Sequence, residues 1–168
     1  HGPYYAFYSI FMKDQGYSET LIGQLWALGV LAEVGLFVVM HHLLGRFGAR
    51  RVLIASLVLA ALRWLLIGNF VESLALLFVA QVLHAATFGT FHAAGIHLVN
   101  HYFRGRHKGR GQALYSSVSF GAGGAVGSLA SGYAWDGLGP AMSYGAAGVV
   151  ALLGALVAWR WIDEQYEL

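Results

Sequence analysis

The sequence predicts an all-α integral membrane protein, a bundle of six transmembrane helices. Its residues are 58% hydrophobic and only 11% charged, whereas soluble domains average about 45–50% apolar and about 25% charged residues. Apolar runs of helical length recur along the chain, and basic residues gather in alternate connections between them. Because charged groups are costly inside the hydrocarbon layer, this arrangement is typical of a chain that crosses a membrane several times.

The predicted helices are the apolar runs, taken in chain order. They cover residues 2–13, 20–44, 51–69, 73–101, 111–134 and 141–161. A helix needs about 20 apolar residues to cross the hydrocarbon layer, and every run after the first approaches or exceeds this length. The connections between the runs are "MKDQGYSET", "LGRFGARR", "GNFVES", "HYFRGRHKGRGQ" and "WDGLGP".

The first run is shorter than a membrane crossing, because about 12 residues make only about 18 Å of helix. We therefore expect residues 1–168 to be part of a longer protein, with the first helix truncated at its N-terminal end and an N-terminal portion missing. A re-entrant or interfacial first segment is the alternative.

The basic residues predict the orientation of the chain. Those in or beside the connections after the second and fourth runs, or near the C-terminal end, are Arg46, Arg50, Arg51, Arg104, Arg106, Lys108, Arg110 and Arg160. The opposite connections hold only Lys13. Since basic loops stay in the cytoplasm, we expect a multi-pass protein of the inner (plasma) membrane with a cytoplasmic C-terminus. The same rule accounts for the basic stretch without nucleic acid, which we do not expect as a partner.

Three ionisable residues, Glu33, Arg63 and His84, lie inside apolar runs. Each is about 16–20 Å from the end of its run, which is near the midplane of a bilayer. A charge there costs about 2.5–3.5 kcal/mol on insertion scales, so we expect the bundle to enclose all three in one polar site. Gln81, one turn before His84, extends the site on the same helix face. Two alternatives stay open: Arg63 forms a purely structural ion pair with Glu33, and His84 is an ordinary interior histidine.

The first run carries one face of aromatic side chains. His1, Tyr4, Tyr5 and Tyr8 are spaced three and four residues apart, so they share one side of a helix. Aromatic rings with polar tips suit an amphipathic organic ligand. A plain packing surface is the alternative.

Histidines supply the only pattern that suggests a metal. His97 and His101 are four residues apart, and His41 and His42 end a neighbouring run on the same side. The chain has no cysteine, no nucleophile elbow and no phosphate loop. We expect no metal, no other cofactor and no enzymatic activity, with a membrane scaffold or a His-rich membrane metal enzyme as the alternative.

The turn "LLGRFGARR" resembles the G-x-x-x-D-R-x-G-R-R signature of the major facilitator superfamily, with Arg46, Gly48 and Arg50 at matching positions. The resemblance implies that these three residues belong to the cytoplasmic gate loop. Further stretches resemble the phenylpropionate permease group, which is related to the lactose permease and to nucleoside/proton symporters. They are "HGPYYAF", "LWALGVLAEV", "LRWLLIG", "QVLHAATF" and "QALYSSV".

This resemblance covers nearly the whole chain. It implies that residues 1–168 form the C-terminal six-helix half of a transporter, built from two inverted three-helix repeats, with substrate bound between the halves. The partner would be the missing N-terminal six-helix half or a second copy of this chain.

The resemblance also implies a site. In lactose permease-like proteins this half carries an acid, an arginine and a histidine, matched here by Glu33, Arg63 and His84. Thr87 stands where a further glutamate is expected, which leaves Glu33 and His84 as the proton-coupling residues. The predicted substrate-binding residues are Arg63, His84, Tyr4, Tyr5, Tyr115 and Gln81.

We therefore expect a secondary active transporter that couples uptake of a small organic acid, aromatic in character, to proton movement by alternating access. The proton is the coupling ion, and the small-molecule substrate and the lipid bilayer are the other expected partners. A proton-coupled sugar or nucleoside permease and a proton-independent facilitator are the alternatives.

Overall fold

The computed structural model describes residues 1–163, which are helical almost throughout and contain no strand. Its α-helices are α1 (Gly2–Asp14), α2 (Glu19–Phe47), α3 (Ala49–Asn69), α4 (Leu74–His84), α5 (Thr90–Tyr102), α6 (Lys108–Ser116), α7 (Gly123–Leu138) and α8 (Pro140–Trp161). A π-helical turn, Ala85–Gly89, joins α4 to α5, and a second one, Ser117–Ala122, joins α6 to α7. Each of these pairs therefore forms one continuous rod. The last residues of the predicted domain, 164–168, lie outside the described part of the chain.

Each predicted run corresponds to one helical rod in the described residues, but two connections are shorter than expected. α2 and α3 are joined by Gly48 alone, and α7 and α8 by Gly139 alone. Both glycines have a positive φ, 77° and 83°, a backbone conformation that side chains with a Cβ rarely adopt. Pro140 then starts α8, where its fixed φ suits the first turn of a helix. Most residues of the predicted connections "LGRFGARR" and "WDGLGP" are therefore helical.

Four rods are long and apolar enough to cross a membrane. They are Glu19–Phe47, Ala49–Asn69, Leu74–Tyr102 and Pro140–Trp161. α1 has only 13 residues, and the rod of α6 and α7 is rich in glycine and serine, which lowers its hydropathy. The prediction of an all-helical, multi-pass membrane bundle is confirmed at this level. The count of six crossings stays a prediction.

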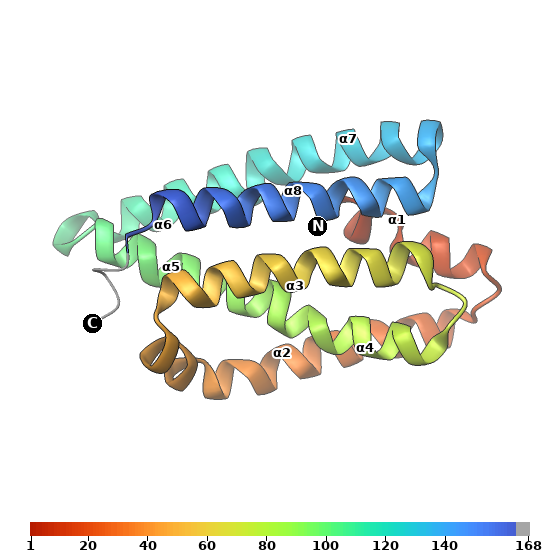
Figure 1. Ribbon diagram of the computed structural model, residues 1–168, viewed down its shortest axis with the longest axis horizontal. Helices are drawn as coiled ribbons and strands as arrows, with labels where there is room; N and C mark the ends of the chain where they lie inside the picture. Colours follow the sequence, from red (N-terminus) through yellow and green to blue (C-terminus); the bar gives the residue numbers. More distant parts are fainter. Residues whose placement is uncertain (164–168) are drawn as a thin grey trace.

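The α3–α8 pair is the most extensive helix contact in the described chain. Figure 1 shows α8 lying along α3, with α7 beside it. Small residues line this contact: Ala60, Ala61 and Ala151 form one buried cluster. Small side chains allow helix backbones to approach closely, which is the usual source of helix association inside a membrane.

The α3–α8 contact predicts a matched pair of alanine variants. A Cβ on Gly68 would lie 2.9 Å from Cβ of Tyr144, whereas a Cβ on Gly145 of α8 would meet nothing within 4 Å. Gly68→Ala should lower the free energy of unfolding by about 1–3 kcal/mol through overpacking. Gly145→Ala gains the same helix propensity without overpacking, so it should not lower the free energy of unfolding. Thermal unfolding of the full-length protein in detergent measures both, and equal melting temperatures would contradict the close contact.

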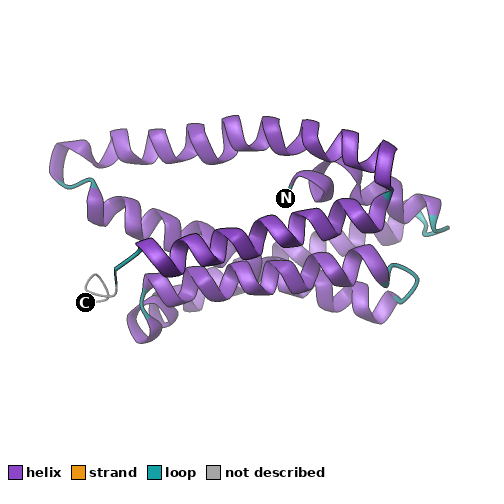
Figure 2. Cartoon of the chain, turned by 45° about the horizontal axis from the view of Figure 1, so that its top comes forward, coloured by secondary structure: helices purple, strands orange, loops and turns teal. Residues whose placement is uncertain are grey.

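The short helix α1 packs inside the bundle. Tyr4, Tyr8 and Met12 are fully buried, and the indole Nε1 of Trp26 in α2 donates a hydrogen bond to Oγ of Ser9, 3.0 Å away. By contrast, the rod of α6 and α7 lies along one edge of the bundle (Figure 2), and most of its residues are exposed. The backbone of α1 packs mainly against α7 and α8. Its Tyr4 side chain reaches Trp26 of α2, Arg63 of α3 and Gln81 of α4, where the midplane residues lie.

Candidate functional site

Arg63 is fully buried in α3 and is held by aromatic rings and a carbonyl group. The guanidinium carbon lies 4.1 Å from the ring centroid of Tyr4 and 4.6 Å from that of Trp64. Its Nε donates a hydrogen bond of 2.7 Å to the carbonyl oxygen of Ala80. Its Nη1 is buried and has no hydrogen-bond partner among the described residues. Cation–π contacts on the guanidinium partly replace the hydration that the charge loses on burial.

Gln81 connects Arg63 to the tyrosine face of α1. Its Oε1 accepts a hydrogen bond from the hydroxyl of Tyr4, 2.9 Å away, and a longer one of 3.4 Å from Nη2 of Arg63. Gly29 of α2 packs against it, since a Cβ there would lie 3.5 Å from Oε1 of Gln81. Gln81 therefore orients Tyr4 and Arg63 together, as a shared acceptor at the centre of the bundle.

Glu33 lies beside His84 and not beside Arg63. Its Oε2 is 3.8 Å from Nε2 of His84, and the two side chains are 15% and 6% exposed. In the described residues the carboxylate close to the midplane therefore faces the histidine. The structural Arg63–Glu33 pair that the sequence left open is not formed. The 3.8 Å separation exceeds a hydrogen bond, so a small movement is needed before a proton can pass directly between the two groups.

Aromatic rings extend from His84 along the rod of α4 and α5 and meet the rod of α6 and α7. The ring of Phe88 stacks on His84 at 5.4 Å between centroids, and His92 stacks on Phe88 at 6.4 Å. From the π-helical turn of the fifth rod, Phe120 lies 6.2 Å from Phe88 and 5.5 Å from His92. Tyr115 completes this aromatic wall, 6.1 Å from His92. The wall thus includes the predicted Tyr115 and His84, from two different rods.

Tyr5 lies on the outer side of this arrangement. It is 53% exposed, whereas Tyr4 beside it is fully buried. Its ring stacks on Trp26 at 6.2 Å and meets the edge of Phe88 at 6.4 Å. The predicted substrate residues therefore form two layers: an inner layer around Arg63 that is sealed by Tyr4, and an outer aromatic layer that is partly open.

Several residues of this site were not predicted from the sequence. They are Trp26, Trp64, Phe88 and Phe120. A helical spacing of four links His84 to Phe88 and Phe88 to His92, so this column could have been found from the sequence. Nothing in the sequence places Phe120 beside it, because that contact joins two rods. Both phenylalanines lie in π-helical turns, which occur often at functional sites.

The predicted gate-loop residues lie at one end of α2 and α3, away from the midplane residues. Nη2 of Arg50 donates a hydrogen bond of 2.6 Å to the carbonyl oxygen of Trp159 in α8. The guanidinium carbon of Arg46 lies 5.4 Å from the ring centroid of Phe47. Gly48 forms the single-residue turn between the helices. The hydrogen bond of Arg50 therefore ties this turn to α8.

The histidines at the helix ends do not assemble a metal site in residues 1–163, where no three potential ligands come together. His41 and His42 lie side by side, with ring centroids 3.8 Å apart. His101 lies by Arg104, whose Nε donates to its carbonyl oxygen at 3.2 Å. The arrangement gives no support to the alternative of a histidine-ligated metal enzyme.

Comparisons with known proteins show the family of the chain. The chain matches the family described as "MFS_1 like family" over residues 1–146. It is 35% identical over 139 residues to the probable 3-phenylpropionic acid transporter of Escherichia coli (strain K12). That match covers 83% of this chain and 36% of the relative, so the chain spans little more than a third of that protein's length. No solved structure matches the chain. The chain belongs to the MFS_1-like family of the major facilitator superfamily, as a phenylpropionate permease-like protein.

Proposed function

We propose that the full-length protein is a proton-coupled symporter for a small aromatic carboxylate in the inner (plasma) membrane. One observation carries this proposal: the guanidinium of Arg63 is fully buried and forms no ion pair with a carboxylate of the described residues, while the only glutamate near the midplane in that part of the chain, Glu33, faces His84. The relative's name, a probable 3-phenylpropionic acid transporter, supports this class of substrate.

Arg63 is the proposed anchor for the substrate's carboxylate. A buried charge without a counter-charge is costly, and a bound carboxylate would supply that counter-charge through two parallel hydrogen bonds. Nη1 has no other hydrogen-bond partner in the described residues, so it is one donor for this contact. Because Tyr4 covers the guanidinium, its ring must move before the carboxylate can reach it. Binding is therefore linked to a rearrangement of α1.

The outer aromatic layer is the proposed surface for the substrate's ring. Tyr5, Phe88 and Phe120 belong to three different rods and present ring faces and edges that suit an aromatic partner. A sugar would need several hydrogen-bond donors and acceptors in the same place. The composition of this layer favours an aromatic acid over the sugar or nucleoside alternatives.

Glu33 and His84 are the proposed proton carriers. Their 3.8 Å separation lets protonation of either group change the charge beside the substrate, and so bias which side of the membrane the site faces. Thr87, at the position where the related permeases carry an acid, donates its hydroxyl to the carbonyl oxygen of His84 at 3.3 Å. That side chain is satisfied within its own helix and has no proton to exchange at neutral pH.

Alternating access requires two halves. We propose that the chain is the C-terminal half, that all its rods cross the membrane as two inverted three-helix repeats, and that its C-terminus is cytoplasmic. The second half is an N-terminal six-helix portion or another copy of the chain. Six helical rods follow one another in the described residues, and four of them are long and apolar enough to cross a membrane, which supports this architecture.

Substrate class is tested by competition. Cells that express the full-length protein take up labelled 3-phenylpropionate, and unlabelled aryl carboxylates, the neutral 3-phenylpropanol, lactose and uridine are added in turn. We expect only the aryl carboxylates to compete. Competition by lactose or uridine, without competition by aryl carboxylates, would establish the sugar or nucleoside alternative instead.

Gly89 gives a matched prediction for the proposed proton site. A Cβ on Gly89 would lie 3.1 Å from Cγ of Glu33, whereas a Cβ on Gly35 of α2 would meet nothing within 4 Å. Gly89→Ala should displace the carboxylate and lower proton-driven uptake on the order of fivefold, an overpacking cost of about 1 kcal/mol. Gly35→Ala should leave uptake unchanged. Uptake rates at equal expression decide this, and two equal rates would contradict the placement of Glu33.

A further inference from the structure

Two cavities flank the first half of α3, and the second extends to Leu36 and Ala86, which lie three and two residues along the chain from Glu33 and His84. The first, of about 600 Å³, is lined by Arg50, Arg51, Ile54, Ala55, Val58, Leu59 and Trp159. The second, of about 380 Å³, is lined by Leu36, Leu43, Phe47, Arg51, Val52, Ala55, Ser56, Leu59, Ala86 and Thr90. Arg51, Ala55 and Leu59 line both cavities. The outward face of α3 therefore forms a ridge between two adjoining grooves.

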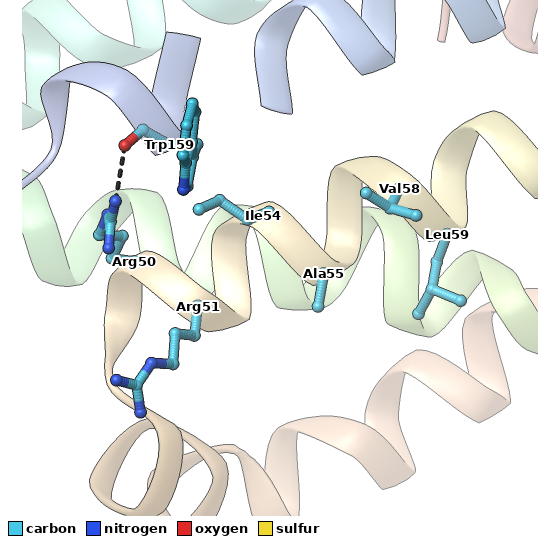
Figure 3. A pocket seen from close by; sticks show the side chains of 7 residues that line it. All are labelled: Arg50, Arg51, Ile54, Ala55, Val58, Leu59 and Trp159. Carbon is cyan, nitrogen blue, oxygen red and sulfur yellow. Dashed lines mark hydrogen bonds between the residues drawn. The ribbon is translucent and has the colours of Figure 1, made fainter. Parts of the chain in front are cut away.

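Each groove has a cationic end and an apolar length. Figure 3 shows Arg50 and Arg51 at the beginning of α3 and the aliphatic side chains further along the helix. From Arg51 to Leu59 is eight residues, or about 12 Å along the helix axis. The second groove is almost entirely apolar beyond Arg51. The chemistry along both grooves thus changes in one direction, from charge to hydrocarbon.

The two arginines are held at the head of these grooves by local structure. Gly48 turns the chain sharply into α3, so Arg50 and Arg51 both lie in its first turn. Nη2 of Arg50 donates to the carbonyl oxygen of Trp159, as the dashed line in Figure 3 marks. Trp159 lies near the end of α8, and tryptophan is enriched at the level of lipid headgroups. The heads of the grooves are therefore at a membrane interface.

We propose that this ridge and its two grooves bind one anionic diacyl phospholipid. The phosphate lies at Arg50 and Arg51, and one acyl chain lies in each groove, on either side of Ala55 and Leu59. Charge complementarity selects an anionic headgroup, and the paired apolar grooves select a molecule with two chains. Inorganic phosphate would use only the cationic end, and a fatty acid would fill only one groove. This site does not depend on the transported substrate.

Native mass spectrometry of the purified full-length protein in detergent tests the proposal. Phosphatidylglycerol, phosphatidylcholine, lyso-phosphatidylglycerol and inorganic phosphate are titrated separately. We expect phosphatidylglycerol to bind with the highest affinity. The double variant Arg50→Gln with Arg51→Gln should weaken it on the order of 30-fold, because basic side chains near an interface attract anionic lipid. The matched double variant Arg106→Gln with Arg110→Gln removes equal charge from another connection and should change binding less than twofold.

A second variant tests the grooves without removing charge. Ala55→Trp places a large ring on the ridge, where the two grooves adjoin. It should weaken binding of phosphatidylglycerol while leaving any binding of inorganic phosphate unchanged. Circular dichroism checks that each variant keeps its helix content. Equal affinity for phosphatidylcholine would overturn the anionic selectivity, and equal affinity for the lyso-lipid would overturn the assignment of two chains. Equal loss in both double variants would show a general charge effect and not this site.

Discussion

Arg63→Gln is expected to reduce uptake of 3-phenylpropionate by the full-length protein on the order of 100-fold or more. Leaving one partner of a buried charge pair without the other costs about 3–5 kcal/mol, and a factor of ten corresponds to about 1.4 kcal/mol. Here the substrate's carboxylate would be the unpaired partner. Glutamine is shorter than arginine, but its amide nitrogen stands at about the position of Nε and is a donor, so the contact with Ala80 can persist while the charge is lost.

Arg63→Lys separates charge from geometry. Lysine keeps the positive charge but cannot form the two parallel hydrogen bonds of a guanidinium, so we expect partial uptake. Arg106→Gln removes an exposed arginine and serves as the matched control. Initial uptake rates are compared at equal expression in the membrane. Normal uptake by Arg63→Gln would remove Arg63 from the role of anion anchor.

Glu33→Gln is expected to abolish accumulation of substrate driven by a proton gradient while exchange of substrate across the membrane continues. Glutamine has nearly the same shape and still fits beside Gly89, but it cannot release a proton. His84 then keeps its ring and loses the carboxylate that lies 3.8 Å away. A transporter that no longer carries the proton equilibrates its substrate and cannot concentrate it.

Two assays on the same vesicles separate these functions. Counterflow, in which unlabelled substrate inside drives entry of labelled substrate, needs no proton movement and should persist within about threefold. Gradient-driven accumulation should fall to the level of equilibration. Glu72→Gln, an exposed glutamate in the connection after α3, is the matched control. Full accumulation by Glu33→Gln would assign proton coupling to another group.

The length and order of the helices could be predicted from the sequence, because the bilayer fixes how many apolar residues a crossing needs. The predicted run of 73–101 corresponds to the rod from Leu74 to Tyr102, for example. The connections were less predictable. A single glycine with positive φ replaces the expected turn at Gly48 and again at Gly139. Because one residue is enough to reverse the chain there, the polar residues on either side of it remain helical.

The depth of the site residues was also predictable, whereas their partners were not. Counting along the helices places Glu33, Arg63 and His84 at similar depth, because the rise per residue is constant. Which side chains meet depends on how each helix is rotated about its axis, and close contacts set that rotation. Gly89 admits Glu33 to the fourth rod, and this turns the carboxylate toward His84.

The π-helical turns add a second reason. Each of them is wider than a turn of a regular α-helix, and this shifts the direction of every side chain that follows it. The turn Ala85–Gly89 begins immediately after His84, and the turn Ser117–Ala122 begins shortly after Tyr115. Past each turn, a projection with regular helical period therefore drifts from the true directions of the side chains. The contact between Phe88 and Phe120 was missed because it joins two rods, whose relative rotation cannot be read from the sequence.

The most direct test of proton-coupled carboxylate transport uses the purified full-length protein in proteoliposomes. Labelled 3-phenylpropionate is added outside with an imposed pH gradient, alkaline inside, and the passive flux of vesicles that carry Arg63→Gln is subtracted. We predict net accumulation above the external concentration that disappears when a protonophore collapses the gradient. Protein-dependent entry that reaches only equilibration, at the same rate with and without the gradient, would contradict proton coupling and indicate a facilitator.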